Sequence, residues 1–245
     1  MSKRLQNKVV LITGSSGGLG KLMARRFLAE GCRIILTGSN PNKLDDTYHE
    51  LGADAENMLA IPADIRTEEH VNVLVKQALE KFGRIDILIN NAGVFKTGEV
   101  TEISAEDFEL TFDIGVRGAF FATKYTARIM KTQKLGQIIN ICSVGSKVGL
   151  DKLSIYCASK AALALFGDSL KVELKPYNIR VTNIFPHAIN SGKNKIDPDS
   201  EKRRQMIEPE DVVEAVIAVT SSEEYVQYQD VTIYPASTTI TKSEE

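Results

Sequence analysis

Short apolar runs recur along the chain, and segments of helical pattern separate them. The runs are rich in β-branched residues and continuous rather than alternating, which is typical of parallel strands that are buried on both faces. They occupy residues 9–13, 33–38, 58–64, 85–93, 137–143, 179–186 and 231–235. Helical patterns lie at residues 18–30, 41–52, 67–82, 105–134, 154–175 and 208–220. This alternation predicts right-handed βαβ units.

The pattern therefore predicts an α/β fold of the Rossmann type. In this fold class a doubly wound, mainly parallel seven-stranded sheet carries helices on both faces. No repeat, linker or shift in composition divides the 245 residues. We therefore expect a single domain over residues 1–245.

Composition and charge narrow the range of partners. The formal net charge is −2 and the charged fraction is 25%, and there is no basic stripe, so we expect no nucleic acid. The N-terminus lacks the apolar region of a signal peptide, and no apolar run is long enough to span a bilayer. The odd set of Cys32, Cys142 and Cys157 matches no metal spacing. Reduced, buried thiols in a cytoplasmic protein are favoured over a redox role for Cys142 and Cys157.

The first apolar run leads directly into a glycine-rich turn, TGSSGGLG (13–20). Gly14, Gly18 and Gly20 have the spacing G-x-x-x-G-x-G. Glycines here let the backbone approach a pyrophosphate closely and let the next helix pack on the sheet. The free amides and positive dipole end of that helix favour an anion. The turn therefore predicts a dinucleotide-binding domain.

The end of the second apolar run bears on which dinucleotide binds. A site that prefers NAD usually places a carboxylate there to bind the ribose hydroxyls. This chain has Gly38 at that position, so no carboxylate repels a 2′-phosphate. Ser39, Asn40 and Lys43 can supply donors or charge, although no arginine is present. The sequence favours NADP(H) and leaves NAD(H) possible; the alternative is a simple turn before a helix.

A tyrosine and a lysine occur in YCASK (156–160). Tyr156 and Lys160 are four residues apart, so their side chains share one face of the predicted helix. A nearby ammonium favours phenolate, so we expect Lys160 to lower the pKa of Tyr156. Tyr156 could then exchange a proton with a carbonyl or alcohol oxygen. Ser143 closes a strand, and its hydroxyl could hold the developing oxyanion.

Together these motifs resemble the short-chain dehydrogenase/reductase family in its short, single-domain form. TGSSGGLG is similar to the family's cofactor turn, and NNAG (90–93) to its fourth-strand motif. YCASK is similar to the catalytic Tyr-x-x-x-Lys, and Ser143 precedes Tyr156 by the thirteen residues that the family shows. The resemblance covers nearly the whole chain, with the motifs in the family's order.

The resemblance implies a set of site residues. It makes Ser143, Tyr156 and Lys160 catalytic, with Lys160 also binding the nicotinamide ribose, and Asn90 a residue that bridges strands rather than a ligand. It implies cofactor contacts at Gly14, Ser15, Ser16, Gly18, Leu19 and Gly20 near the phosphates, at Ser39, at Asp64 and Ile65 near the adenine, at Asn91, Ala92 and Gly93 on the adenosine side, and at Tyr156, Lys160, Ile189 and Ser191.

Two positions depart from the family's pattern. Gly115 stands where the family usually has a fourth catalytic residue, an asparagine that orders a water linking the lysine to solvent. This substitution puts the proton relay in doubt unless a main-chain carbonyl suffices. His187 replaces a glycine that normally follows Pro186. Its side chain either protrudes into the substrate pocket or is tolerated at the rim, and the second reading is favoured.

The long polar segment 187–207 would border the substrate site, and we expect a mobile substrate loop there. Its charged residues include Lys193, Lys195, Lys202, Arg203 and Arg204. These fit a polar or anionic substrate, although a solvated loop explains the same charges and is favoured.

The sequence predicts an NAD(P)H-dependent oxidoreductase that interconverts a carbonyl and an alcohol by hydride transfer. The alternative is a weakly active or inactive dinucleotide-binding sensor or scaffold, which Gly115 and His187 motivate. An epimerase or dehydratase is disfavoured because no C-terminal substrate domain is evident. We expect a small-molecule carbonyl or alcohol substrate and no resident metal. The resemblance also implies a homodimer or homotetramer that forms through residues 105–134 and 154–175.

Overall fold

The computed structural model describes residues 4–52, 54–190 and 200–237. Within these ranges the strands are β1 (Val9–Thr13), β2 (Arg33–Gly38), β3 (Met58–Pro62), β4 (Ile87–Asn90), β5 (Gly136–Ile141), β6 (Ile179–Pro186) and β7 (Asp230–Ile233). They form one 7-stranded sheet in the order β3-β2-β1-β4-β5-β6-β7. Each pair of neighbours is parallel. The predicted α/β, doubly wound sheet is confirmed.

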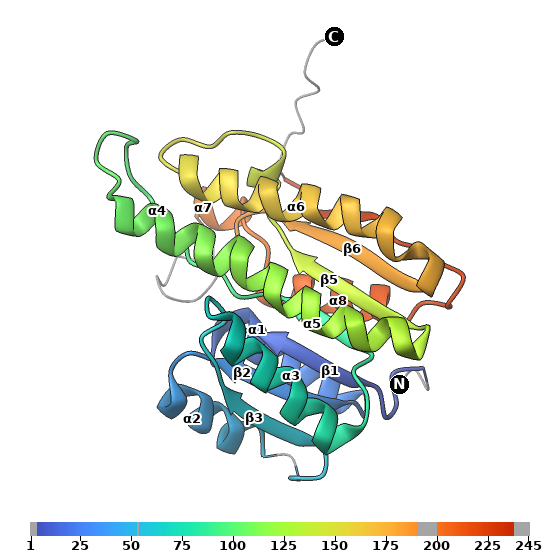
Figure 1. The fold of residues 1–245 in the computed structure, drawn as a ribbon. Coiled ribbons are helices and arrows are strands. Elements are labelled where there is room, and N and C mark those ends of the chain that lie inside the picture. Colours follow the sequence, from blue (N-terminus) through green and yellow to red (C-terminus); the bar gives the residue numbers. More distant parts are fainter. Residues whose placement is uncertain (1–3, 53, 191–199, 238–245) are drawn as a thin grey trace.

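Helices cover both faces of this sheet (Figure 1). They are α1 (Gly18–Ala29), α2 (Pro41–Leu51), α3 (Glu68–Phe82), α4 (Ala105–Phe112), α5 (Gly118–Gln133), α6 (Ser154–Leu174), the short α7 (Glu201–Arg204) and α8 (Pro209–Thr220). Short 3-10 turns occur at Val144–Ser146 and Lys175–Tyr177. No helix among the described residues is both long enough and apolar enough to cross a membrane.

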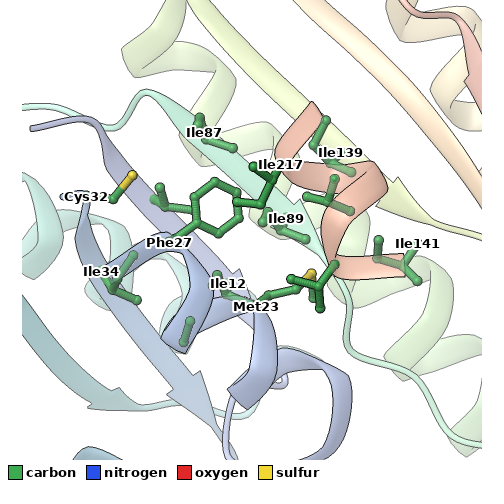
Figure 2. Packing of buried hydrophobic residues seen from close by; sticks show 14 of the residues in the cluster. Ile12, Met23, Phe27, Cys32, Ile34, Ile87, Ile89, Ile139, Ile141 and Ile217 are labelled. Carbon is green, nitrogen blue, oxygen red and sulfur yellow. The ribbon is translucent and has the colours of Figure 1, made fainter. Parts of the chain in front are cut away.

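The continuous apolar runs are explained by burial on both faces. Val10 and Ile12 of β1 belong to a cluster that packs against α1 and α8, where Met23 and Phe27 are fully buried (Figure 2). Their neighbours Val9 and Leu11 point to the opposite face, into a second cluster that includes α3, α5 and α6. Because successive side chains of a strand alternate between faces, a strand with two covered faces is apolar throughout.

The sheet order reverses between β1 and β4. Crossovers run in opposite directions from this point, and in open α/β sheets ligands bind at the carboxyl ends of the strands where the order reverses. The glycine turn follows β1, and Asn91–Gly93 follows β4, which ends at Asn90 rather than at the expected residue 93. The fold therefore brings these two motifs to the same place.

The predicted helix over residues 105–134 is interrupted. Asp113–Arg117 forms a π-helical turn between α4 and α5, and Gly115 lies at its centre. The main chain of Gly115 is buried against α6, because a Cβ placed there would lie 3.7 Å from Ser159 Oγ. Single π turns in long helices often occur at functional sites, and this one carries the residue that departs from the family pattern.

Buried amides link three strands. Asn90 Nδ2 donates to Asn140 Oδ1 at 2.9 Å, and Asn140 Nδ2 donates to Asn183 Oδ1 at 3.0 Å. These three residues are register partners on β4, β5 and β6. Gly167 of α6 sits directly over them, since a Cβ on it would approach Asn183 Oδ1 to 2.2 Å. The prediction that Asn90 bridges strands is confirmed.

The ends of the segment 187–207 are held together. Ile189 and Ile207 form a parallel bridge, and Asn190 N donates to the Ile207 carbonyl at 2.9 Å. Arg203 forms an ion pair with Glu208. The segment thus leaves and re-enters the fold at one point, whereas Lys193, Lys195 and Ser191 lie outside the described residues.

Candidate active site

The glycine turn has the geometry of an anion cradle. Gly14 and Gly18 have φ of 66° and 53°, in the left-handed region that favours glycine. A Cβ on Gly14 would come within 2.9 Å of Ala92 Cα, and one on Gly20 within 2.4 Å of the Gly14 carbonyl oxygen. Gly17 caps α1 without a side chain, and no acidic residue lies in the first turn. The first amides of α1 can therefore bind a phosphate.

The two serines in this turn have different surroundings. Ser15 is fully buried, and its hydroxyl accepts from Thr37 N at 2.8 Å. Its side chain thus ties the turn to β2, and only its main chain can take part in binding. Ser16 is partly exposed and lies beside Gly38, where a Cβ would meet Ser16 Oγ at 2.7 Å. Leu19 packs against the first hydrophobic cluster.

The end of β2 presents polar groups without a carboxylate. Gly38 is buried under Ser16, and the exposed Ser39 follows it. The Asn40 side chain caps α2 by accepting from Lys43 N at 3.0 Å. Its amide nitrogen and the exposed Lys43 side chain remain available as donors.

Asp64 is engaged by a neighbour that sequence reasoning overlooked. Arg66 donates from Nη2 to Asp64 Oδ2 at 2.6 Å and from Nε to Oδ1 at 2.9 Å. Its main-chain N also donates to Oδ1 at 3.0 Å. The Arg66 guanidinium holds the pKa of the Asp64 carboxyl below its usual range. Ile65 packs onto the main chain of Gly118, where a Cβ would meet Ile65 Cδ1 at 2.6 Å.

The loop after β4 is fastened to the glycine turn through Thr13. The Thr13 hydroxyl accepts from Asn91 N at 3.0 Å and from Ala92 N at 3.1 Å. Asn91 Nδ2 in turn donates to the Thr13 carbonyl at 2.9 Å. Gly93 lies next to Lys160, because a Cβ on it would be 3.4 Å from Lys160 Nζ. The main chain of Asn91–Gly93 thus connects the anion cradle to Lys160.

Ser143, Tyr156 and Lys160 are brought together at the same edge. Ser143 caps the 3-10 turn after β5, and its Oγ accepts from Gly145 N at 3.1 Å. Because this bond uses an acceptor lone pair, the hydroxyl proton is free to donate. The Ser143 side chain lies close enough to act on the pKa of Tyr156, which lies in the first turn of α6. Lys160 is 6% exposed one turn later.

The net shift in the pKa of Tyr156 is opposite to the expected lowering. Burial raises the pKa of Tyr156, and the Ser143 side chain only partly opposes this. The Lys160 ammonium donates to the Ile141 carbonyl at 2.6 Å, and burial lowers the pKa of Lys160. Desolvation disfavours the charged form of either group. In this state Tyr156 is therefore held as a protonated phenol.

The cysteines near this site are free and buried. Cys142 is 3% exposed, and burial raises the pKa of its thiol to about 12. Cys157 is 8% exposed and faces Gly145, where a Cβ would meet its Sγ at 2.9 Å. A thiolate is the reactive form of cysteine, so these surroundings agree with the reading of small buried side chains.

His187 contacts Gln205 and Tyr234. Its Nδ1 is 3.2 Å from the Gln205 carbonyl oxygen, and its ring packs 5.2 Å from that of Tyr234. Both contacts draw the imidazole toward the ends of the 187–207 segment. They favour the reading in which the His187 side chain is tolerated at the rim of the substrate pocket. Ile189 lies nearby in the bridge with Ile207.

Phe95 is a site neighbour that sequence reasoning missed. Its ring meets that of Tyr156 edge-on, with centroids 4.9 Å apart and planes at 72°. The side chain is nevertheless 63% exposed. Phe95 follows Val94 in the loop after NNAG, and no sequence pattern there marks it as part of the site.

Comparison with known proteins agrees with this architecture. A family model described as short chain dehydrogenase matches residues 8–202. The chain belongs to the short-chain dehydrogenase family. An oxidoreductase of Staphylococcus saprophyticus is 31% identical over 94% of this chain and 98% of its own. The expectation that the chain is a member of this oxidoreductase family is confirmed.

Solved structures of family members superimpose closely. A 3-ketoacyl-(acyl-carrier-protein) reductase from Brucella melitensis, complexed with NADH, has a TM-score of 0.85 at 28% identity and covers 95% of this chain and 98% of its own. Levodione reductase has a TM-score of 0.83 at 30% identity, covering 94% of this chain and 97% of its own. An archaeal alcohol dehydrogenase from Thermococcus sibiricus, complexed with 5-hydroxy-NADP, shares the fold at 23% identity and a TM-score of 0.83.

Proposed function

We propose that this short-chain dehydrogenase interconverts a carbonyl and an alcohol with a nicotinamide dinucleotide, and that Tyr156 is its general acid and base. The proposal is supported by one observation. Ser143, Tyr156 and Lys160 lie at the same edge of the sheet as the anion cradle. Relatives bearing NADH and an NADP analogue support the cofactor class.

The residues present fit such a cofactor. The uncapped amides of α1, with Gly14, Gly18 and Gly20, would hold the pyrophosphate. Ser39 and the Asp64–Ile65 segment would border the adenosine, and Asn91–Gly93 would lie along it. Ile189 and Ser191 would approach the carboxamide. When bound, the nicotinamide supplies or accepts the hydride.

The protein's own groups handle the proton. In the direction of reduction, the Tyr156 hydroxyl gives its proton to the carbonyl oxygen as negative charge develops there. Ser143 donates its free hydroxyl proton to the same oxygen and so stabilises that charge. In the reverse direction the Tyr156 phenolate takes the proton of the alcohol. Lys160, beside Gly93, would bind the nicotinamide ribose.

We also propose a preference for NADP(H) over NAD(H). The support is local: Gly38 contributes no carboxylate, and Ser16 fills the space where an acidic side chain would begin. The exposed Ser39 and Lys43 side chains can donate to a 2′-phosphate.

A second candidate is a dinucleotide-binding sensor or scaffold with little turnover. Gly115 favours it, because the position lacks the amide that the family uses in its proton relay. The raised pKa of Tyr156 is also consistent with slow proton exchange. Retention of Ser143, Tyr156 and Lys160 in one site favours the enzyme.

Three further properties belong to the proposal. The substrate is a small molecule, and the protein acts in the cytoplasm. The assembly is a homodimer or homotetramer. Support for the assembly comes from apolar side chains that α5 and α6 leave exposed, namely Phe120, Leu165 and Val172 at 45%, 68% and 77%.

The decisive experiment is a panel of aldehydes and ketones assayed with NADPH and with NADH, using wild type and Tyr156→Phe. Loss of the phenolic proton should lower kcat by about 10²- to 10⁴-fold without loss of cofactor binding. Tyr225→Phe is the matched control, because Tyr225 is 88% exposed. Tight NADPH binding with no turnover across the panel would instead support the sensor.

A further inference from the structure

Phe95 and Leu150 expose apolar surface directly beside the reacting groups. Phe95 touches the ring of Tyr156 and is 63% exposed, and Leu150 is 39% exposed. A Cβ on Gly145 would lie 3.4 Å from Leu150 Cδ1 and 3.4 Å from Ser143 Oγ, so both side chains lie against the turn at Gly145. Single exposed apolar residues are common on proteins. An exposed ring that contacts Tyr156, with a second exposed apolar side chain on the turn that Ser143 caps, is not explained by that background.

The two loops that carry these residues are joined. Gly98 N, three residues after Phe95, donates to the Lys152 carbonyl at 2.9 Å, two residues after Leu150. This hydrogen bond holds together the two loops that carry Phe95 and Leu150. Such preorganisation is what a substrate-orienting surface requires.

The two lysines nearest to this surface, Lys96 and Lys152, form ion pairs. Lys96, next to Phe95, lies 2.6 Å from an Asp107 carboxylate oxygen. Lys152 lies 3.4 Å from a Glu99 carboxylate oxygen. Ion pairs of this kind leave little net charge to attract a substrate carboxylate, so the surface suits an uncharged group.

We propose that Phe95 and Leu150 form an apolar clamp that selects carbonyl substrates bearing a neutral aromatic or conjugated group. The carbonyl oxygen lies between the Ser143 and Tyr156 hydroxyls, and the planar group lies against the exposed face of Phe95, with Leu150 limiting it on the serine side. Aromatic rings pair in offset or edge-on arrangements, which gives selectivity beyond apolar contact. This inference rests on the proposed function and adds a substrate class to it.

The test compares benzaldehyde with cyclohexanecarbaldehyde, which has similar size but no π system. The measured quantity is the ratio of their kcat/KM values with saturating NADPH. Phe95→Ala and Phe95→Leu should each lower this ratio about 5- to 10-fold, because both remove the aromatic face. The KM for NADPH should not change. Val100→Ala is the control, since Val100 is 74% exposed further along the same loop; it should leave the ratio unaltered.

A charged analogue tests the second half of the proposal. 4-Carboxybenzaldehyde should have a kcat/KM at least about tenfold below that of benzaldehyde, because its carboxylate would be desolvated without a partner. Equal losses for both uncharged aldehydes in Phe95→Ala would overturn the clamp and reduce Phe95 to a packing neighbour of Tyr156. A higher kcat/KM for 4-carboxybenzaldehyde than for benzaldehyde would overturn the proposal that the substrate carries a neutral group.

A binding measurement separates this inference from the proposed function. Calorimetry with NADP⁺-saturated protein compares benzyl alcohol with cyclohexylmethanol. Weaker binding of benzyl alcohol alone in Phe95→Ala supports the clamp even if no carbonyl is turned over, in which case only the enzymatic proposal fails. Turnover of carbonyls with an unchanged ratio in Phe95→Ala refutes the clamp and leaves the enzyme intact.

Discussion

Lys160 Nζ donates a hydrogen bond of 2.6 Å to the main-chain carbonyl of Ile141. This bond joins α6 to the carboxyl end of β5, two residues before Ser143. It holds the buried lysine beside Gly93, at the boundary between the cofactor cradle and the catalytic groups. The proposed contact of Lys160 with the nicotinamide ribose would use this position beside Gly93.

The pH dependence of activity follows from these surroundings. Burial raises the pKa of Tyr156 above its ordinary value of about 10, so the phenol stays protonated at neutral pH. Reduction needs the phenol and should be nearly constant from about pH 6 to about pH 9. Oxidation needs the phenolate and should rise steadily over about pH 7 to about pH 10. Initial rates in both directions at saturating cofactor would measure this. A plateau in oxidation below about pH 8 would contradict it.

Gly115→Asn should raise turnover if the missing side-chain amide limits the proton relay. The structure has room for the first atom, because a Cβ would lie 3.7 Å from Ser159 Oγ, an ordinary contact. Gly115→Ala is the matched control: it fills the same space without an amide. Both variants should gain up to about 1 kcal/mol of stability, since glycine is unfavourable within helices. Only Gly115→Asn should increase kcat. An unchanged kcat would exclude the side-chain amide as the limiting element.

The preference for NADP(H) can be tested at Gly38. Gly38→Asp places a carboxylate where it would repel a 2′-phosphate and bind ribose hydroxyls. Its Cβ must displace Ser16, whose Oγ would be 2.7 Å away, so overall affinity should fall for both cofactors. The ratio of kcat/KM for NADPH to that for NADH should fall by more than about tenfold. Gly38→Ala introduces the same crowding without charge and should leave the ratio unaltered. Equal ratios in the two variants would refute a role for charge.

Gly167→Ala should destabilise the fold without touching the site. A Cβ there would lie 2.2 Å from Asn183 Oδ1 and 2.6 Å from Asn140 Nδ2, so the amide ladder or α6 must move. Overpacking and a disturbed buried network together should cost about 2–3 kcal/mol. Urea unfolding measures the difference. Gly149→Ala is the control, because no atom lies within 4 Å of its Cβ position. Similar midpoints for the two variants would show that α6 yields at little cost.

Local patterns predicted the strands because the sheet is covered on both faces. Val9–Thr13 has no exposed side, so its composition alone identifies a buried strand. The glycine turn was equally readable, since left-handed φ and close main-chain contacts at Gly14 require glycine. Helix periodicity predicted that Tyr156 and Lys160, which are four residues apart, share one face of α6.

Other features depend on contacts between distant segments. The π turn at Gly115 interrupts a pattern that reads as one helix, and it occurs where that helix packs on Ser159 of α6. Nothing near Phe95 in the sequence indicates that its ring meets Tyr156.

The amino-acid sequence by itself determined the order of the functional motifs along the chain and the polar groups that they supply to the site. These motifs also indicated the family. Such features depend on local periodicity and residue type. The tertiary structure alone decided how those groups interact. It buried Tyr156, and burial raises the pKa that the sequence predicted to be lowered. Desolvation is a property of everything packed around a residue, and spacing along one helix does not report it.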